Sequence, residues 1–206
     1  MVRLSYTAKS MAETPPVLVD MDGVLADFDA EVLARVGVRY PQIPLLGERQ
    51  KPRIRDDYPE YRELVHGVAL EEGFFASLSL VDEALEGWQR ILDAGYHPRV
   101  CSSPILANPY CQGEKLAWLD AHLAPIFGKA VVDEAIITRE KYLQNGIAQI
   151  DDSPTIQHEE QAVWQHIMFD APYNQSATEH PRLYGWLDGN LPALLDAAAH
   201  VYGVRA

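Results

Sequence analysis

The sequence predicts an α/β fold, a three-layer sandwich of the Rossmann type with a central parallel sheet. Short apolar runs alternate along the chain with longer segments of helical periodicity. Several of these runs end in acidic or other polar side chains. Because the carboxyl ends of parallel strands form one edge of a sheet, where ligands bind, we expect those polar side chains to gather there.

The first expected strand is residues 16–20, a continuous apolar run of the kind found in strands covered on both faces. It leads into the sequence DMDG, which places Asp20 and Asp22 two positions apart. Burial of an unpaired carboxylate is costly, so hydrogen bonds, a cation or both must compensate these acids. A third acid, Asp27, is expected either to serve the site or to cap a helix that begins near Phe28.

Residues 34–74 interrupt the alternation. This stretch is charged, has only a loose helical pattern and contains Pro41, Pro44, Pro52 and Pro59. An insertion after the first strand accounts for this stretch. The insertion is either a functional cap or a purely structural segment. We therefore divide the chain into a tail (1–14), a core (15–33 and 75–206) and a small inserted helical cap (34–74).

The alternation resumes after the insertion. Residues 80–94 have an apolar helical stripe, and Gly95 is expected to end this helix. The next strand is expected over 97–103, followed by a helix over 108–123 with Asn108 as its N-cap. Further strands are predicted at 135–139, 147–152 and 166–170, and a last helix at 190–202.

Three segments place polar side chains where expected strands end. CSSP supplies the hydroxyls of Ser102 and Ser103 as donors to phosphate, TREK supplies the compact cation Lys141, and IDDSP supplies a second acidic pair, Asp151 and Asp152. Together with DMDG, this set suits phosphoryl transfer. In that chemistry one carboxylate attacks phosphorus, a second donates a proton and later activates water, and a cation holds the negative oxygens.

A divalent cation would also compensate the acids, because Mg²⁺ takes oxygen ligands and keeps water and substrate phosphate in its shell. The DMDG segment is not an EF-hand loop, since its glycine stands at the fourth position instead of the sixth and a strand precedes it. The seven histidines show no ligand spacing such as H-x-x-x-H, and we assign none of them to a metal.

Composition excludes other classes of function. A net charge of −13 argues against a general affinity for nucleic-acid polymers. No apolar run approaches the roughly 18 residues of a membrane span, and the first residues lack a signal-peptide pattern, so we expect a cytoplasmic protein without a membrane partner. The two cysteines, Cys101 and Cys111, are too few for a disulfide framework and are expected to be reduced.

The segments VDMDGVLAD, CSSP, TREK and IDDSP, in that order, resemble the four motifs of haloacid-dehalogenase-type (HAD-like) phosphatases. A finer resemblance is to the 5'(3')-deoxyribonucleotidases, and it covers roughly residues 15–196. It rests on the segments GFF (73–75), PYCQGEKLAW (109–118), IITREK (136–141), WQHIMFD (164–170) and GWLDGN (185–190).

This resemblance implies roles for the acids. Asp20 would be the nucleophile that becomes an aspartyl phosphate, and its other oxygen would bind Mg²⁺. Asp22 would be the general acid and base, with its backbone carbonyl on the metal. Asp152 would be the remaining protein ligand, and Asp151 would support the ligands from behind.

The resemblance also implies how the phosphate is held. Ser102 stands where the family usually has threonine, and its retained hydroxyl would still contact phosphate. Lys141 would neutralise the nucleophile and the phosphoryl oxygens. Glu114 and Lys115 lie in a family-like segment, yet on a helix they could equally be surface charges. Arg139 is expected to form a structural ion pair.

The resemblance weakens in the cap, where animal members of the family place aromatic residues around the nucleobase. The aligned positions here hold Pro52, Arg53, Ile54 and Ala69. Pyrimidine specificity is therefore an open question. Arg53 and Arg55 either meet an anionic or differently shaped substrate or belong to the solvated surface.

The function that follows is Mg²⁺-dependent hydrolysis of a deoxyribonucleoside monophosphate through an aspartyl phosphate. One alternative is the same chemistry on a sugar phosphate or another small phosphate monoester. Another is a non-catalytic protein that binds Mg²⁺ and a phosphorylated ligand. The resemblance further suggests a homodimer.

Overall fold

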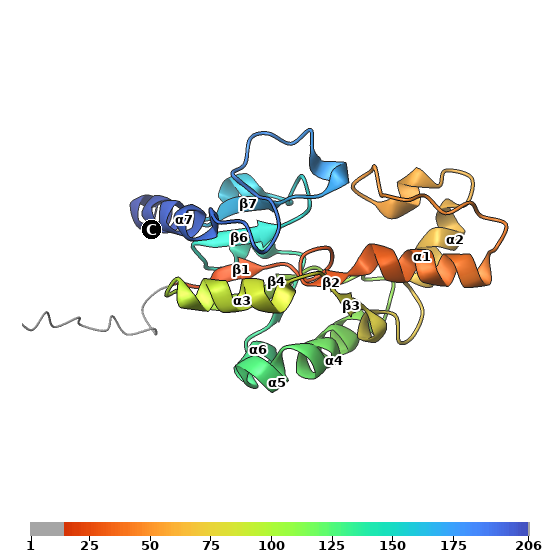
Figure 1. The fold of residues 1–206 in the computed structure, drawn as a ribbon, viewed down its shortest axis with the longest axis horizontal. Coiled ribbons are helices and arrows are strands. Elements are labelled where there is room, and N and C mark those ends of the chain that lie inside the picture. Colours follow the sequence, from red (N-terminus) through yellow and green to blue (C-terminus); the bar gives the residue numbers. More distant parts are fainter. Residues whose placement is uncertain (1–14, 206) are drawn as a thin grey trace, which may run out of the picture.

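The computed structural model describes residues 15–205, so the predicted tail, 1–14, lies outside the described residues. A six-stranded sheet with the order β5-β4-β1-β6-β7-β8 forms its centre, and every neighbouring pair in it is parallel. Figure 1 shows the helices packed around this sheet and a separate lobe at the end opposite to the C-terminus. The predicted α/β class with a central parallel sheet is confirmed.

The central strand, β1 (Val17–Val19), pairs with β4 (Pro98–Ser102) on one side and β6 (Ala148–Asp151) on the other. The sheet continues with β5 (Ile136–Ile137) at one edge, and with β7 (Gln165–Phe169) and β8 (Arg182–Leu183) at the other. In register, Val19 lies opposite both Val100 and Ile150, so the segments that leave these three strands emerge at the same edge.

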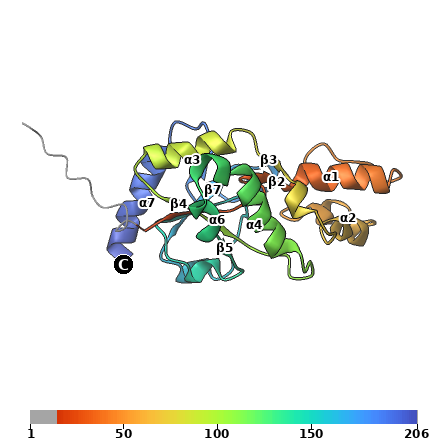
Figure 2. The ribbon, with the colours of Figure 1, turned by 90° about the horizontal axis from the view of Figure 1, so that it is seen from below.

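The two faces of β1 enter two hydrophobic clusters, because successive side chains of a strand point to opposite faces. Val17 and Val19 join the main core, which includes Trp88 and Trp118, whereas Leu18 packs in a smaller cluster with Trp164. Helices α3 (Ala84–Asp93) and α7 (Leu191–Arg205) contact each other and cover the main core. Helices α4 (Cys111–His122), α5 (Ala124–Phe127) and α6 (Ala130–Asp133) complete this layer, seen from below in Figure 2. Trp88, Trp118 and Trp164 are all buried in these clusters.

A small antiparallel sheet, β2 (Ala26–Asp27) with β3 (Ser79–Leu80), connects the core to the lobe. The lobe contains α1 (Phe28–Arg39), the 3₁₀ helix η1 (Ile54–Asp57) and α2 (Arg62–Val68), and the 3₁₀ helix η2 (Phe75–Ser77) leads back from it. Both ribbon views place α1 and α2 side by side, away from the six-stranded sheet. The expected start of the cap, residue 34, lies inside α1 and not between two elements. The domain limits drawn from the sequence stay a prediction.

Further 3₁₀ helices occupy loops that the sequence left unassigned: η3 (Lys141–Leu143), η4 (Glu159–Gln161) and η5 (Pro172–Asn174). The sequence also missed β2, β3 and β8, because strands of two residues are too short to show a period of two. The N-cap role of Asp27 is confirmed, since its carboxylate accepts a 3.0 Å hydrogen bond from the Ala30 amide.

Two predicted helix starts are wrong. The helix expected from residue 80 begins at Ala84, because Leu80 pairs in β3. The helix expected from 108 begins at Cys111, and Asn108 instead stabilises the preceding turn by accepting a 2.8 Å hydrogen bond from the Tyr110 amide. The Asn108 side chain also donates to the Ala69 carbonyl at 2.9 Å, so it ties this turn to the lobe.

Candidate active site

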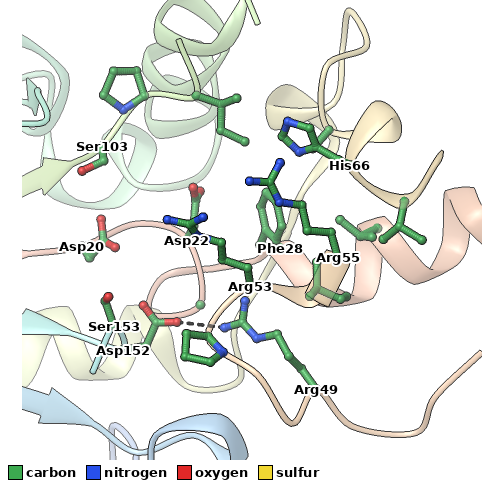
Figure 3. A pocket seen from close by; sticks show the side chains of 18 of the residues that line it. Asp20, Asp22, Phe28, Arg49, Arg53, Arg55, His66, Ser103, Asp152 and Ser153 are labelled. Carbon is green, nitrogen blue, oxygen red and sulfur yellow. Dashed lines mark hydrogen bonds and ion pairs between the residues drawn. The ribbon is translucent and has the colours of Figure 1, made fainter. Parts of the chain in front are cut away.

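A pocket of about 520 Å³ opens between the carboxyl edge of the sheet and the lobe. Asp20, Asp22 and Asp152 line it from the sheet. Figure 3 shows guanidinium groups of the lobe facing these acids across the pocket. The polar strand ends predicted from the sequence are therefore brought together at one edge.

Asp20 directly follows β1 and is buried. Lys141 Nζ lies 2.9 Å from Asp20 Oδ1 and 2.6 Å from Asp151 Oδ2. Burial alone would raise the pKa of Asp20, but the charges of Lys141 and Lys115 hold that pKa below its usual value. Asp20 is therefore ionised at neutral pH, as a carboxylate nucleophile requires.

The pKa of Asp22 is shifted in the opposite direction, upwards. Burial raises its pKa above the ordinary value, although Lys115 Nζ, 2.7 Å from Asp22 Oδ2, opposes the rise. The other oxygen, Oδ1, is buried and has no hydrogen-bond partner within residues 15–205. Asp22 thus retains a proton more readily than Asp20 does, and this separation of the two pKa values is what an acid beside a nucleophile needs.

Lys115 was not assigned to the site from the sequence, and its alternative interpretation as a surface charge is wrong. The side chain is fully buried and donates to Asp22 Oδ2, to Ser102 Oγ at 2.8 Å and to the Ser103 carbonyl at 3.2 Å. A signal was present in the sequence. Lys115 shares a helical stripe with Cys111, Trp118 and Leu119, and these four are the buried residues of α4.

Glu114 is not a surface charge either. Its carboxylate accepts hydrogen bonds from the backbone amides of Gly73 at 2.5 Å and Phe75 at 2.9 Å. These contacts fix the GFF segment, where the chain leaves the lobe, against α4. Glu114 is thus a structural residue of the junction between lobe and core.

The two serines differ in their surroundings. Ser102 is buried at the end of β4, and its hydroxyl contributes to the low pKa of Asp20. Ser103 is exposed, lines the pocket and donates to the Thr138 carbonyl at 3.3 Å. Both serines, together with Lys141, line a second hollow next to this pocket.

The second acidic pair completes a cluster of carboxylates. Oxygens of Asp20, Asp151 and Asp152, one from each residue, lie within 4.8 Å of one another. Burial, together with the charges of Asp151 and Asp20, raises the pKa of Asp152 to about 7. Within residues 15–205, ion pairs to these three buried carboxylates come only from Lys141 and Arg49, which leaves one negative charge uncompensated when all three are ionised. Oxygen donors are the ligands that Mg²⁺ prefers. This buried cluster indicates a metal site.

The ligand set expected from the sequence differs in one member from this cluster. The side chains of Asp20 and Asp152 are both in it, whereas the third member is Asp151 and not Asp22. The expectation for Asp22 concerned its backbone carbonyl, so the two sets are compatible.

Asp152 is surrounded by residues that sequence reasoning missed. Arg49 Nη2 lies 3.2 Å from Asp152 Oδ2, the contact dashed in Figure 3, and the Tyr173 hydroxyl donates to the same oxygen. The Arg49 guanidinium stacks on the Tyr173 ring, 3.4 Å from its centroid. Gly23 has a positive φ of 78°, and a Cβ there would overlap the Asp152 carboxylate, so the glycine of DMDG is required.

The arginines considered from the sequence face the pocket. Arg53, Arg55 and Arg139 all line it, so a purely surface role for the first two does not hold. The structural ion pair expected for Arg139 is wrong for the described part of the chain, where no carboxylate lies within 4.0 Å of its guanidinium. Ile54 and Ala69, two positions where the resemblance weakens, also line the pocket.

No helix within residues 15–205 is long and apolar enough to cross a membrane.

Comparison with known proteins gives concordant findings. Residues 14–197 match the family model "5' nucleotidase, deoxy (Pyrimidine), cytosolic type C protein". The human cytosolic 5'(3')-deoxyribonucleotidase is 36% identical over 198 residues, which is 91% of this chain and 96% of that protein. A Bordetella pertussis protein that carries the same activity name provisionally is 38% identical over 170 residues, 81% of this chain and 89% of its own length.

Among solved structures, a HAD hydrolase of family IA from Entamoeba histolytica superposes with a TM-score of 0.50 at 13% identity, covering 90% of this chain and 99% of that one. At this identity the likeness concerns the fold alone, and it confirms the HAD-like fold.

Proposed function

The chain belongs to the family of cytosolic type C deoxy (pyrimidine) 5'-nucleotidases, and from this premise we propose how its site works. It is an enzyme, a phosphomonoesterase of the 5'(3')-deoxyribonucleotidase type. The observation that carries the proposed mechanism is the contrast between two acids of one loop, because the pKa of Asp20 is lowered and that of Asp22 is raised.

In the first step, a carboxylate oxygen of Asp20 attacks the phosphorus of the monoester. A bond forms between that oxygen and phosphorus, and the bond between phosphorus and the ester oxygen breaks. Asp22 gives its proton to the departing ester oxygen, so the nucleoside leaves as a neutral alcohol. Lys141, 2.9 Å from Asp20, neutralises charge on the phosphoryl oxygens.

In the second step, Asp22, now ionised, takes a proton from a water molecule as that water attacks the aspartyl phosphate. The bond between Asp20 and phosphorus breaks, inorganic phosphate leaves, and Asp22 again carries the proton that the next cycle needs. Lys115 holds Asp22 in place at 2.7 Å during both transfers, and it keeps the Ser102 hydroxyl beside Asp20.

The residues present fit a divalent cation, which we propose to be Mg²⁺ bound by the side chains of Asp20 and Asp152 and by the backbone carbonyl of Asp22. When bound, it supplies positive charge to the phosphoryl oxygens. Asp151 supports this set from behind, since its carboxylate accepts from Lys141 and, at 3.0 Å, from the Ser153 amide.

The substrate class we propose is the deoxyribonucleoside monophosphates named for the human relative. The part of the substrate beyond the phosphate would lie among Phe28, Arg53, Arg55 and His66, which line the pocket on the side of the lobe. Because two of these are guanidinium groups, carbonyl-rich bases or a second anionic group would be favoured there.

A substrate panel tests the proposal. Deoxyribonucleoside 5'- and 3'-monophosphates, ribonucleotides and sugar phosphates are assayed with Mg²⁺ and with a chelator. We expect release of phosphate from deoxyribonucleotides with Mg²⁺ and none with the chelator. Faster turnover of a sugar phosphate would favour the alternative substrate class.

The covalent step is tested by Asp20→Asn, which removes the nucleophile while keeping its shape. We expect turnover to fall by a factor on the order of 10³ or more, with the unfolding temperature maintained. Asp82→Asn, at an exposed acid that lies outside the pocket, is the matched control and should leave turnover unchanged. Activity of Asp20→Asn equal to that of the control would refute the mechanism.

Two further predictions from the sequence accompany this proposal. A homodimer is expected and would be measured by sedimentation. A cytoplasmic location is also expected, although the human relatives include a mitochondrial type, 31% identical over 192 residues, besides the cytosolic one.

A further inference from the structure

A second group of metal-binding side chains lies behind the active site: Glu159, His166 and His180. They come from η4, from β7 and from the segment between β7 and β8. One nitrogen or oxygen atom from each lies within 4.8 Å of those of the other two. The spacing of the histidines does not indicate this group, because the fold brings its members together from separate segments.

The contacts of His166 require a cation beside the ring. Its side chain is fully buried, and Nε2 lies 3.4 Å from the Asp151 carbonyl oxygen. A carbonyl oxygen only accepts, so Nε2 carries the hydrogen in this contact. In the neutral ring Nδ1 then bears a lone pair, and it faces Glu159 Oε2 at 3.3 Å. Two acceptors face each other, so a proton or a metal ion must lie between them.

The carboxylate of Glu159 also faces a second histidine. Its other oxygen, Oε1, lies 3.4 Å from His180 Nδ1, and the two imidazole rings lie 4.4 Å apart between centroids. Nitrogen and oxygen atoms of all three side chains are therefore within reach of one ion.

The distances favour a metal ion over hydrogen bonds. Charge-assisted N–H···O bonds are about 2.7–2.9 Å long, shorter than both contacts of Glu159. In tetrahedral Zn²⁺ sites the bonds to nitrogen and oxygen are about 2.0–2.1 Å, which places neighbouring ligand atoms about 3.3–3.4 Å apart. The separations of 3.3 Å from His166 Nδ1 to Glu159 Oε2 and of 3.4 Å from His180 Nδ1 to Glu159 Oε1 have this length, although each ends on a different oxygen of the carboxylate.

The group has its own access from solvent. It lines an open pocket of about 790 Å³, whose wall also carries the carboxylates of Glu160 and Glu179. None of the three residues lines the active-site pocket. The additional acids give the entrance a negative charge, which favours entry of a cation.

We propose that Glu159, His166 and His180 bind a Zn²⁺ ion, with water as the fourth ligand. The ion would tie η4 and the segment before β8 to strand β7. The Asp151 carbonyl orients the His166 ring, as backbone carbonyls commonly do for metal-binding histidines. The site is independent of the proposed nucleotidase mechanism.

The test uses protein without a polyhistidine tag, stripped with a chelator and kept in excess Mg²⁺ so that the active site is occupied. Calorimetric titration with Zn²⁺ is expected to show one site per chain in the wild type. His180→Ala and Glu159→Gln should each weaken binding at least tenfold. His200→Ala, at an exposed histidine of α7, is the matched control and should bind like the wild type.

Co²⁺ provides a second readout, because tetrahedral Co²⁺ with nitrogen and oxygen ligands absorbs in the visible range. We expect this absorption in the wild type and its loss in His180→Ala. The proposal would be overturned if the wild-type protein bound no Zn²⁺. It would also be overturned if the variants bound Zn²⁺ with unchanged affinity, because the bound metal would then be an adventitious ion only. Phosphatase activity with Mg²⁺ is expected to persist in His180→Ala, so failure here is distinguishable from failure of the proposed function.

Discussion

At the scale of single residues, the site depends on giving two aspartates of one loop different neighbours. Asp20 pairs with Lys141, and Asp22 pairs with Lys115. Asp20 is buried and Asp22 is partly buried, so desolvation raises both pKa values, and the balance of nearby charge decides the outcome. Both lysines lower both pKa values, but only Asp20 pairs directly with Lys141, and the negative charge of Asp20 raises the pKa of Asp22 further. Residue type alone therefore does not assign nucleophile and acid.

Lys115 provides a prediction at this scale. Lys115→Met keeps the length of the side chain but leaves Asp22 and Ser102 without their shared donor. We expect kcat to fall about 10²–10³-fold, the effect of removing one preorganised donor from a reacting site. Lys115→Arg should not restore activity, because a planar guanidinium does not replace a compact ammonium with three acceptors at 2.7, 2.8 and 3.2 Å.

The control is Lys129→Met, which breaks a pair of similar length, 2.8 Å to Asp120, on the surface. Steady-state kinetics should show no change for this variant. Full activity of Lys115→Arg would contradict the role given to the buried ammonium.

At the scale of elements, α3 supports the nucleophile loop through a close approach to Trp186. A Cβ at Gly87 in α3 would overlap the Trp186 ring, and the Trp186 indole N–H donates to the Val24 carbonyl at 2.8 Å, one residue after Gly23. A glycine in the middle of a helix is unfavourable by itself. Gly87 is tolerated because it allows this contact.

Gly87→Ala is expected to destabilise the protein by about 1–3 kcal/mol, the usual cost of overpacking a core. Gly113 in α4 is a matched control, since a Cβ there has nothing within 4 Å. Gly113→Ala should be neutral or stabilise by up to about 1 kcal/mol through helix propensity. Urea unfolding measures both. Equal effects of the two substitutions would exclude the proposed support of the loop by α3.

The lobe provides a prediction about substrate binding. Arg55 lines the pocket from η1, away from the reacting acids. Arg55→Ala should raise KM for the best deoxyribonucleotide about tenfold and leave kcat within about threefold, because the contact would be made equally in ground and transition states. Arg62→Ala, at an exposed arginine of α2 outside the pocket, should change neither constant. A loss confined to kcat would place Arg55 in the chemical step instead.

At the scale of the whole molecule, the acidic cluster links stability to pH and to metal. The folded protein raises the pKa of Asp152 from 3.8 to about 7, so folding favours the protonated form. The stability contributed by this group is fully present below about pH 4 and is lost as the pH rises through about 7. Metal-free protein should therefore be less stable at pH 8 than at pH 5.

Asp152→Asn removes this titration. We expect the metal-free variant to unfold at a higher temperature than the wild type at pH 8, and the difference to shrink at pH 5. Adding Mg²⁺ at pH 8 should raise the unfolding temperature of the wild type and have little effect on the variant. Thermal melts with Mg²⁺ and with chelator check both points, and a variant that responds to Mg²⁺ like the wild type would remove Asp152 from the ligands.

The sequence by itself determined the α/β class, most of the strands and helices, and the order of the polar strand ends. These features depend on neighbouring residues, through apolar periodicity, turn residues and caps such as Asp27. The same local patterns predict that the polar residues after the strands meet at the carboxyl edge of a parallel sheet, namely Asp20, Asp22, Ser102, Lys141 and Asp152.

Only the tertiary structure decided what surrounds those residues. Lys115 lies 93 positions from Asp22, and Arg49 lies 103 positions from Asp152. The group of Glu159, His166 and His180 likewise forms across two loops and a strand. No periodicity encodes such pairs, because burial and distance between remote segments arise only when the sheet is assembled. The physical reason is that pKa values and metal affinity depend on three-dimensional charge and desolvation, which the order of residues does not specify locally.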